Sequence, residues 1–201
     1  LQAVSTLEGS KPRVRTSLGG DDEVEASHSR RDSILLIYDC LYPESLGGVE
    51  RRNLDLARSI AAFGNRVALA APVTEPEQIP SGVTVIPLPD RGGLYSKGGK
   101  RRVSTGLRYS RSIADLDISP FDVIETANVP FLHLPALQRR CRRAGKFLVV
   151  SWYECWRGYW RKYLGPIRGL AAAAIELWTA RRCGDLLIAS SYLTERRLRQ
   201  L

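Results

Sequence analysis

A pair of glycines, Gly47 and Gly48, stands between a short apolar run that begins at Ile34 and an amphipathic segment. The run predicts a buried strand, and apolar residues at helical spacing predict that a helix follows, at Val49, Leu56, Ile60 and Phe63. At the start of this helix, free N–H groups and the positive end of the helix dipole could bind an anion. The glycines could also form only a tight turn, with Glu50 stabilised by the dipole.

An aromatic segment with embedded charges follows Trp152 and reads WYECWRGYWRKYLG. Aromatic rings cover the apolar C–H faces of sugars, and polar groups fix sugar hydroxyls. The segment therefore predicts a sugar-binding wall, with candidate binding residues Tyr153, Glu154, Trp156 and Arg157. The rings are also spaced about like one face of a short helix, so a core role stays open for about half of them.

Basic residues gather in three places in a chain whose formal net charge is +9. One run reads KGGKRR and contains Lys97, Lys100, Arg101 and Arg102. The other two are Arg108 with Arg111, and residues 139–143. Such patches attract anionic lipid headgroups or a phosphate-bearing acceptor, and we expect the KGGKRR run to form this contact. Solvated helix faces are the alternative interpretation.

Strand and helix patterns alternate along the chain after residue 32. Strands are predicted near Ile34–Asp39, Arg66–Ala71, Val83–Leu88, Asp122–Thr126, Lys146–Trp152 and Asp185–Ser190. Their alternation with helices implies a doubly wound, mainly parallel, Rossmann-like α/β sheet. Because ligands bind beyond the carboxyl ends of such strands, we expect the glycine pair, the basic run and the aromatic segment at one edge.

The helical patterns lie at residues 49–63, 101–116, 134–144 and 167–182. Gly64 follows the first pattern where a helix end favours a left-handed residue. The last pattern has one continuous apolar face, formed by Ile167, Leu170, Ala171, Ala174, Ile175 and Trp178. His133 precedes the third pattern with only His28 as a second histidine, so we expect it to be structural.

Several motifs, in a consistent order, resemble a known family. The loop Y-P-x-x-x-G-G-x-E, the helix N-L-x-x-A-x-x-I-x-x-x-G and the following strand beginning R-V resemble the opening of a family-4 GT-B glycosyltransferase. Phe121–Ile124, the aromatic segment and Asp185–Ser191 resemble later segments of the same N-terminal domain, so the resemblance spans residues 33–201. Tyr153 departs from the family pattern W-H-E-x-W, in which histidine holds this position.

The resemblance implies that residues 33–201 are the acceptor-side domain, one half of a GT-B fold, without the donor-binding C-terminal domain. Members of this family transfer a sugar from a nucleotide-diphosphate donor with retention of configuration, generally without a metal or another cofactor. The implied acceptor is a glycan or a lipid-linked sugar. Gly47, Gly48 and Glu50 would lie near the diphosphate, and the aromatic segment would shape the acceptor pocket. No residue is assigned as the catalytic base, and we expect the isolated chain to be inactive.

Composition limits the remaining possibilities. Residues 1–32 lack apolar periodicity and a signal-peptide pattern, so we predict a disordered tail. No apolar run reaches the roughly 18 residues of a membrane helix. The four cysteines form no C-x-x-C pair and have no matching histidines, which argues against a zinc site and favours a cytoplasmic compartment. The basic patches add an expected peripheral contact at the inner membrane face.

The sequence lacks the motifs of other nucleotide-binding folds. The first loop lacks the G-x-G-x-x-G of dinucleotide-binding domains, and residues 93–100 miss the P-loop spacing by one residue. No nucleic-acid recognition module is visible, so nucleic-acid binding remains a weaker alternative. The main alternative is a non-catalytic glycan- or partner-binding module of the same fold, because Tyr153 replaces the family's histidine.

Overall fold

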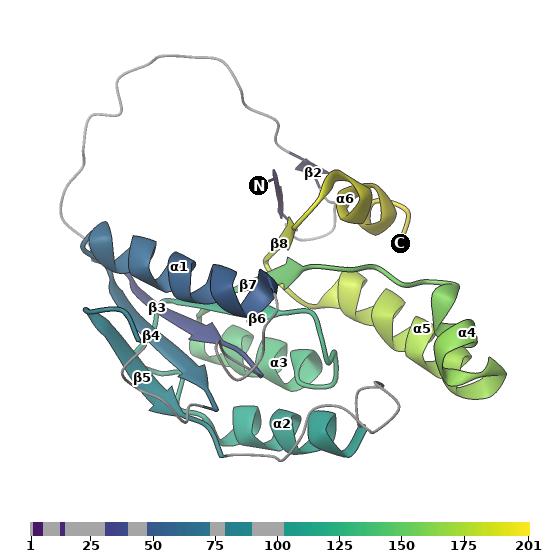
Figure 1. Ribbon diagram of the computed structural model, residues 1–201, viewed down its shortest axis with the longest axis horizontal. Coiled ribbons are helices and arrows are strands. Elements are labelled where there is room, and N and C mark those ends of the chain that lie inside the picture. Colours follow the sequence, from purple (N-terminus) through teal and green to yellow (C-terminus); the bar gives the residue numbers. More distant parts are fainter. Residues whose placement is uncertain (1, 6–12, 15–30, 40–47, 73–78, 90–102) are drawn as a thin grey trace.

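The structure, a computed structural model, describes residues 2–5, 13–14, 31–39, 48–72, 79–89 and 103–201. Its centre is a sheet with the strand order β2-β1-β8-β7-β6-β3-β4-β5 (Figure 1). The parallel strands are β3 (Ser33–Ile37), β4 (Arg66–Ala71), β5 (Val83–Pro87), β6 (Val123–Ala127), β7 (Phe147–Trp152) and β8 (Leu186–Ala189). These six are the six strands predicted from the sequence.

The chain winds outward from the middle of the sheet in both directions. It runs from β3 through β4 to β5 on one side, and then from β6 through β7 to β8 on the other. Helix α1 (Gly48–Ala62) covers one face, while α2 (Val103–Asp115) and α3 (Leu134–Ala144) cover the opposite face (Figure 1). This arrangement confirms the doubly wound, Rossmann-like α/β fold.

Alternating strand residues feed two separate cores, as the two-residue period of a strand requires. On the α1 side, Leu36 and Leu69 pack with Leu54 and Ala57 of the helix. On the other side, strand residues such as Leu35, Ile37, Leu148 and Val150 pack with Tyr109 and Ile113 of α2 and with Leu134 and Leu137 of α3. Burial on both faces explains why the strands are almost continuously apolar.

The predicted apolar face of α1 is correct except at its end. Val49, Leu56 and Ile60 are partly buried against the core, whereas Phe63 is 85% exposed. Helix α1 ends at Ala62, and Gly64 adopts a left-handed conformation with φ of +82°. Phe63 therefore lies beyond the last helical turn, where the helical period no longer points it at the sheet.

A helical hairpin follows β7. It consists of α4 (Tyr159–Leu164) and α5 (Pro166–Arg182), which extend together beyond the sheet (Figure 1). The two helices touch at Gly169, where an added Cβ would lie 2.5 Å from the Arg161 Cα. The predicted apolar face of α5 turns outward: Ile167 is 84% exposed and Leu170 is 67% exposed.

Two short strands, β1 (Gln2–Ser5) and β2 (Arg13–Val14), lie within the stretch predicted as a disordered tail. β1 pairs antiparallel with β8, and β2 pairs antiparallel with β1. The prediction of a tail over residues 1–32 is therefore wrong at these residues, because the outer edge of β8 offers backbone groups that a short strand can pair with. Residues 6–12 and 15–30 lie outside the described residues.

None of the described helices is both long enough and apolar enough to cross a bilayer.

Candidate functional site

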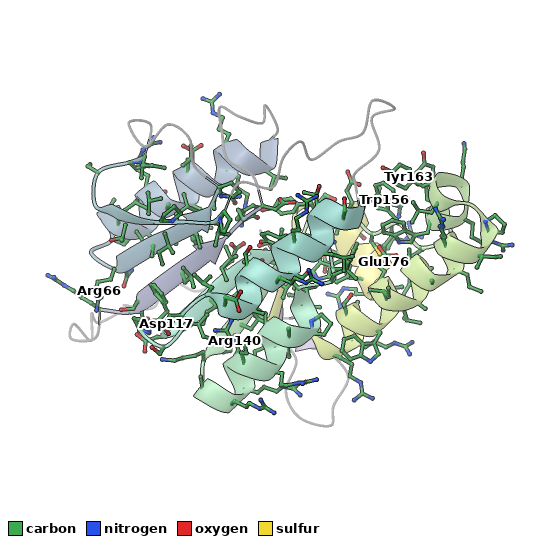
Figure 2. All side chains as sticks on the ribbon, turned by 90° about the horizontal axis from the view of Figure 1, so that it is seen from below. Arg66, Asp117, Arg140, Trp156, Tyr163 and Glu176 are labelled. Atoms are coloured by element: carbon green, nitrogen blue, oxygen red, sulfur yellow. The ribbon has the colours of Figure 1, made fainter. Side chains whose placement is uncertain are left out.

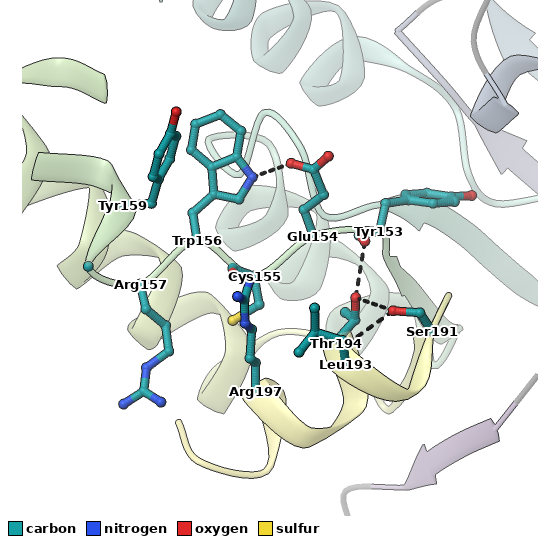
Figure 3. A pocket seen from close by; sticks show the side chains of 11 residues that line it. Tyr153, Glu154, Cys155, Trp156, Arg157, Tyr159, Ser191, Leu193, Thr194 and Arg197 are labelled. Atoms are coloured by element: carbon teal, nitrogen blue, oxygen red, sulfur yellow. Dashed lines mark hydrogen bonds between the residues drawn. The ribbon is translucent and has the colours of Figure 1, made fainter. Parts of the chain in front are cut away.

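A pocket of about 560 Å³ opens beyond the carboxyl ends of β7 and β8 (Figure 3). Residues 153–159, which follow β7, form one wall of this pocket. Helix α6 (Tyr192–Leu198) and its N-cap Ser191 form the other wall, with Leu193, Thr194 and Arg197. The four aromatic-segment candidates, Tyr153, Glu154, Trp156 and Arg157, all line this one pocket.

Hydrogen bonds to the backbone hold the two walls together. The Tyr153 carbonyl oxygen accepts from Ser190 Oγ and Thr194 Oγ1, each at 3.1 Å (Figure 3 shows the second bond). Arg197 Nη1 donates to the Cys155 carbonyl oxygen at 3.0 Å. Ser191 caps α6 by accepting from the Thr194 N–H, as a serine at a helix start does. The pocket therefore depends both on the turn after β8 and on residues 153–158, the aromatic loop between β7 and α4.

The Glu176 side chain of α5 fixes the aromatic loop by hydrogen bonds. Its carboxylate accepts from the backbone N–H of Trp156 at 2.7 Å, from that of Arg157 at 2.6 Å and from Trp160 Nε1 at 3.1 Å. The side chain is fully buried and lies beside Trp156 (Figure 2). Buried charges are stable only when hydrogen-bonded, and these three donors meet that requirement.

The aromatic side chains form a cluster around Trp156. Its ring centroid lies 5.4 Å from that of Tyr159, 4.7 Å from that of Trp160 and 4.9 Å from that of Tyr163. Trp156 Nε1 also donates to the Glu154 carboxylate (Figure 3). Trp152 is fully buried while Tyr159 is 51% exposed, so the segment serves both the core and the pocket.

A second group of polar side chains lies next to the pocket and is centred on Tyr153. Its hydroxyl lies 2.5 Å from the Tyr38 hydroxyl and accepts from Arg52 Nη1 at 2.9 Å. The Arg52 guanidinium also lies 5.7 Å from the centroid of the Tyr153 ring. Arg52 comes from α1, four residues after Gly48, so the start of α1 and the end of β7 meet here.

The buried carboxyl of Glu125, on β6, supports this group from inside the sheet. Ser151 Oγ donates to Glu125 Oε1 at 2.5 Å, and Arg52 Nη1 lies 3.5 Å from the same oxygen. Burial raises the pKa of Glu125, although Ser151 and Arg52 oppose the shift. Burial also raises the pKa of Tyr153 and of Tyr38, so both phenols keep their protons at neutral pH.

The family model for Glycosyltransferase Family 4 matches residues 46–201. The chain belongs to Glycosyltransferase Family 4. No curated protein matches the chain. Membership gives this domain a glycosyltransferase-type function, in agreement with its Rossmann-like fold.

The structure describes only some of the remaining predicted site residues of this family-4 domain. Gly48 is exposed at the start of α1, and no atom lies within 4 Å of a Cβ added there. Gly47, the side chain of Glu50 and the KGGKRR run with Lys97, Lys100, Arg101 and Arg102 lie outside the described residues. The roles predicted for them stay predictions.

Arg140, in the third predicted basic patch, has a structural contact. It donates to the carbonyl oxygens of Ile113 and Leu116, at the C-terminal end of α2. A cation at this position satisfies the last carbonyls of the helix and complements its dipole. Arg140 therefore joins α3 to α2, while Arg139, Arg142 and Arg143 are exposed.

Sequence reasoning missed Arg52, Glu125, Glu176 and Arg197. Two of these had a usable signal. Arg52 stands one helical turn after Gly48, which places both on one face of α1. Glu176 is the one acidic residue in an otherwise apolar helical run, and a charge on such a helix needs partners. Glu125 and Arg197 have no comparable local signal.

The environments of His133 and Cys155 argue against a role for either in catalysis. His133 is fully buried, its Nε2 lies 3.1 Å from Thr126 Oγ1, and burial lowers its pKa to about 3. It is therefore neutral, as expected of a structural histidine. Burial raises the pKa of the Cys155 thiol to about 12, so this pocket residue is not a thiolate nucleophile. No group of His, Cys, Asp and Glu among the described residues could hold a metal ion.

Proposed function

We propose that this domain is the acceptor-side half of a retaining hexosyltransferase. It would transfer a sugar from a nucleotide-diphosphate donor to a glycan or a lipid-linked acceptor. The observation that carries this proposal is the pocket between the aromatic loop and α6. It combines aromatic rings with charged and hydroxyl groups at the carboxyl edge of the sheet, where ligands of such folds bind.

The acceptor fits the chemistry of this pocket. A volume of about 560 Å³ lies within the usual range of small-ligand sites. The rings of Trp156 and Tyr159 offer apolar surface to the C–H faces of a sugar. Glu154, Arg157 and Arg197 lie on the same walls, where they could accept from and donate to its hydroxyls.

The donor diphosphate would approach the start of α1. Gly48 leaves its first turn unobstructed, and Arg52 places a guanidinium one turn further along the same face. Positive charge and N–H donors stabilise the diphosphate leaving group of a transition state that resembles an oxocarbenium ion. We propose that this stabilisation needs no metal and that a second domain supplies the rest of it.

Two features support placing the protein in the cytoplasm. Cys141, Cys155 and Cys183 are buried free thiols, which suits a reducing compartment. A nucleotide-sugar donor, as proposed here, would be found in the same compartment. Peripheral contact with the inner face of a membrane would bring a lipid-linked acceptor to the pocket.

Nuclear magnetic resonance can test the acceptor pocket by measuring the binding of a panel of oligosaccharides to the full chain. Trp156→Ala should weaken binding by roughly tenfold, because stacking and apolar burial are lost. Trp178→Ala is the matched control, since Trp178 lies half exposed on the outer face of α5. Equal binding by both variants, or no binding of any sugar by the wild-type chain, would contradict the pocket assignment.

Transfer is tested by comparing the 201-residue chain with an enzyme that also carries a donor-binding domain. We expect turnover only from the two-domain enzyme, because the proposed reaction takes place between two domains. Robust transfer by the 201-residue chain alone would refute this division of roles.

A non-catalytic glycan- or partner-binding module remains the second candidate, and Tyr153 is the observation that favours it. The family's histidine position is filled by a phenol whose hydroxyl is engaged by Tyr38 and Arg52. We expect Tyr153→His to be tolerated or to raise turnover in the two-domain enzyme. Sugar binding without turnover, in both the wild type and Tyr153→His, would favour the binding module instead.

A further inference from the structure

Helix α5 turns its continuous apolar face away from the rest of the protein. The side that faces the protein includes Gly169, the carboxylate of Glu176 and Thr179, all buried. The side that faces outward is apolar from Ile167 to Trp178. Exposed fractions there are 84% for Ile167, 67% for Leu170, 38% for Ile175 and 49% for Trp178, with Ala171 and Ala174 also exposed between them. These six residues form the α5 outer face.

Basic residues lie at both ends of the α5 outer face: Arg168 near its start, and Arg181 and Arg182 after Trp178, all three exposed. Arg161 and Lys162 of α4 are exposed as well. The two helices contain a single acidic residue, Glu176, which is fully buried. The hairpin therefore exposes an apolar face together with positively charged side chains, and neither helix has an exposed carboxylate.

We propose that the α5 outer face lies on an anionic lipid bilayer. An apolar face with a tryptophan, bordered by arginine and lysine, is the pattern of helices that lie in the plane of a membrane interface. The apolar stems of the arginines can follow the helix while their guanidinium groups reach lipid phosphates. The twelve residues from Ile167 to Trp178 give an apolar contact about 18 Å long, parallel to the surface.

Charge distinguishes this occupant from a second copy of the chain. A symmetric dimer would bring the same patch of each copy together, and with it two identical basic borders. Their mutual repulsion disfavours that arrangement, whereas an anionic bilayer complements both the apolar face and the basic border. This inference does not require sugar transfer.

The hairpin also connects this surface to the pocket. The inner side of α5 carries Glu176, which holds the Trp156–Arg157 backbone, so loop and outer face lie on opposite sides of one helix. The distance between them is about one helix diameter, roughly 10 Å. If the proposed function holds, a lipid-linked acceptor would meet the pocket close to the membrane surface.

Vesicle flotation of the full chain tests the inference, with phosphatidylcholine vesicles that contain phosphatidylglycerol and with phosphatidylcholine alone. We expect binding only to the anionic vesicles, and weaker binding as salt rises. Ile167→Ser with Leu170→Ser should weaken it at least about tenfold, since apolar burial is lost. Arg168→Gln with Arg182→Gln should weaken it by roughly fivefold per charge.

Phe63→Ser is the matched control, because Phe63 is a large apolar residue that is 85% exposed at the end of α1. This variant should bind as the wild type does. Three results would overturn the inference: equal binding to neutral vesicles, a lipid-free dimer that Ile167→Ser with Leu170→Ser dissociates, or binding that only charge reversal at Lys100, Arg101 and Arg102 removes. The second would assign the face to another copy, and the third would assign the contact to the KGGKRR run.

Discussion

Replacing Glu176 by glutamine should loosen the aromatic loop without unfolding the domain. The carboxylate accepts two bonds at Oε2, from Arg157 N and Trp160 Nε1, and one at Oε1, from Trp156 N. A glutamine can offer its single oxygen to the two donors at the Oε2 position. Its amide group would then face the Trp156 N–H, so at least that one bond is lost.

The size of this effect follows from the burial of the site. A hydrogen bond to a charged group contributes about 1.5–3 kcal/mol, and Glu176 is fully buried. Loss of one such bond corresponds to about 2 kcal/mol, or roughly thirtyfold in the equilibrium between the closed and open loop. Glu176→Ala removes all three acceptors and should open the loop further, since a buried N–H without a partner costs free energy.

Hydrogen exchange of the Trp156 and Arg157 amides measures this equilibrium directly. Both amides should exchange roughly thirtyfold faster in Glu176→Gln, while amides of β7 stay protected. Glu154→Gln makes the same chemical change on an exposed side chain of the same loop. Because Glu154 accepts from the Trp156 ring and not from these amides, that variant should exchange as the wild type does.

Sugar binding by the same variants gives a second measurement. If the loop shapes the pocket, Glu176→Gln should weaken oligosaccharide binding by the factor by which the closed fraction of the loop falls. Unchanged exchange at Trp156 and Arg157 in Glu176→Gln would refute the role given to this carboxylate.

Three further predictions concern single positions. Gly48→Val should fold, because nothing lies within 4 Å of an added Cβ, yet it should cut turnover of the two-domain enzyme sharply by screening the α1 N–H groups; wild-type turnover would contradict this role. Gly169→Ala should lower the free energy of unfolding by about 1–3 kcal/mol, since its Cβ would lie 2.5 Å from the Trp160 carbonyl oxygen, with Gly158→Ala, which meets no atom within 4 Å, as the control in urea denaturation. Burial lowers the pKa of His133 to about 3, so the unfolded chain binds this proton first and stability should fall as the pH drops from about 6.5 toward 3. His133→Gln should flatten that part of a plot of stability against pH, and an unchanged slope would show that other groups set it.

The strand framework could be predicted because strands buried on both faces leave an almost continuous apolar signal. Helix ends were predictable where a single residue fixes them. Gly145, after α3, has a φ of 63° and ends the helix at the predicted residue, and Ser191 starts α6 by capping it. The aromatic loop was found from composition alone, since four neighbouring candidates came from one short segment.

The orientation of α5 could not be predicted, because a helical period identifies an apolar face without saying what it contacts. The usual expectation buries such a face, whereas here the buried side of α5 carries Glu176, which contacts the aromatic loop. The Arg52–Tyr153 contact was equally hidden, since it joins residues 101 positions apart. Long-range pairs of this kind depend on strand order, which local patterns do not encode.

The pairing of β1 with β8 bears on the order in which the domain can form. It joins Gln2 to Ala189 and Ser5 to Leu186, so strands at opposite ends of the domain must meet. Contacts this distant in sequence carry a large loop-closure entropy and tend to form late. On a ribosome, β1 is synthesised long before β8, so nearly the whole domain must follow before these two strands can pair. Until that moment the edge of β1 that pairs with β8 is open to other chains, which makes synthesis the stage most exposed to aggregation.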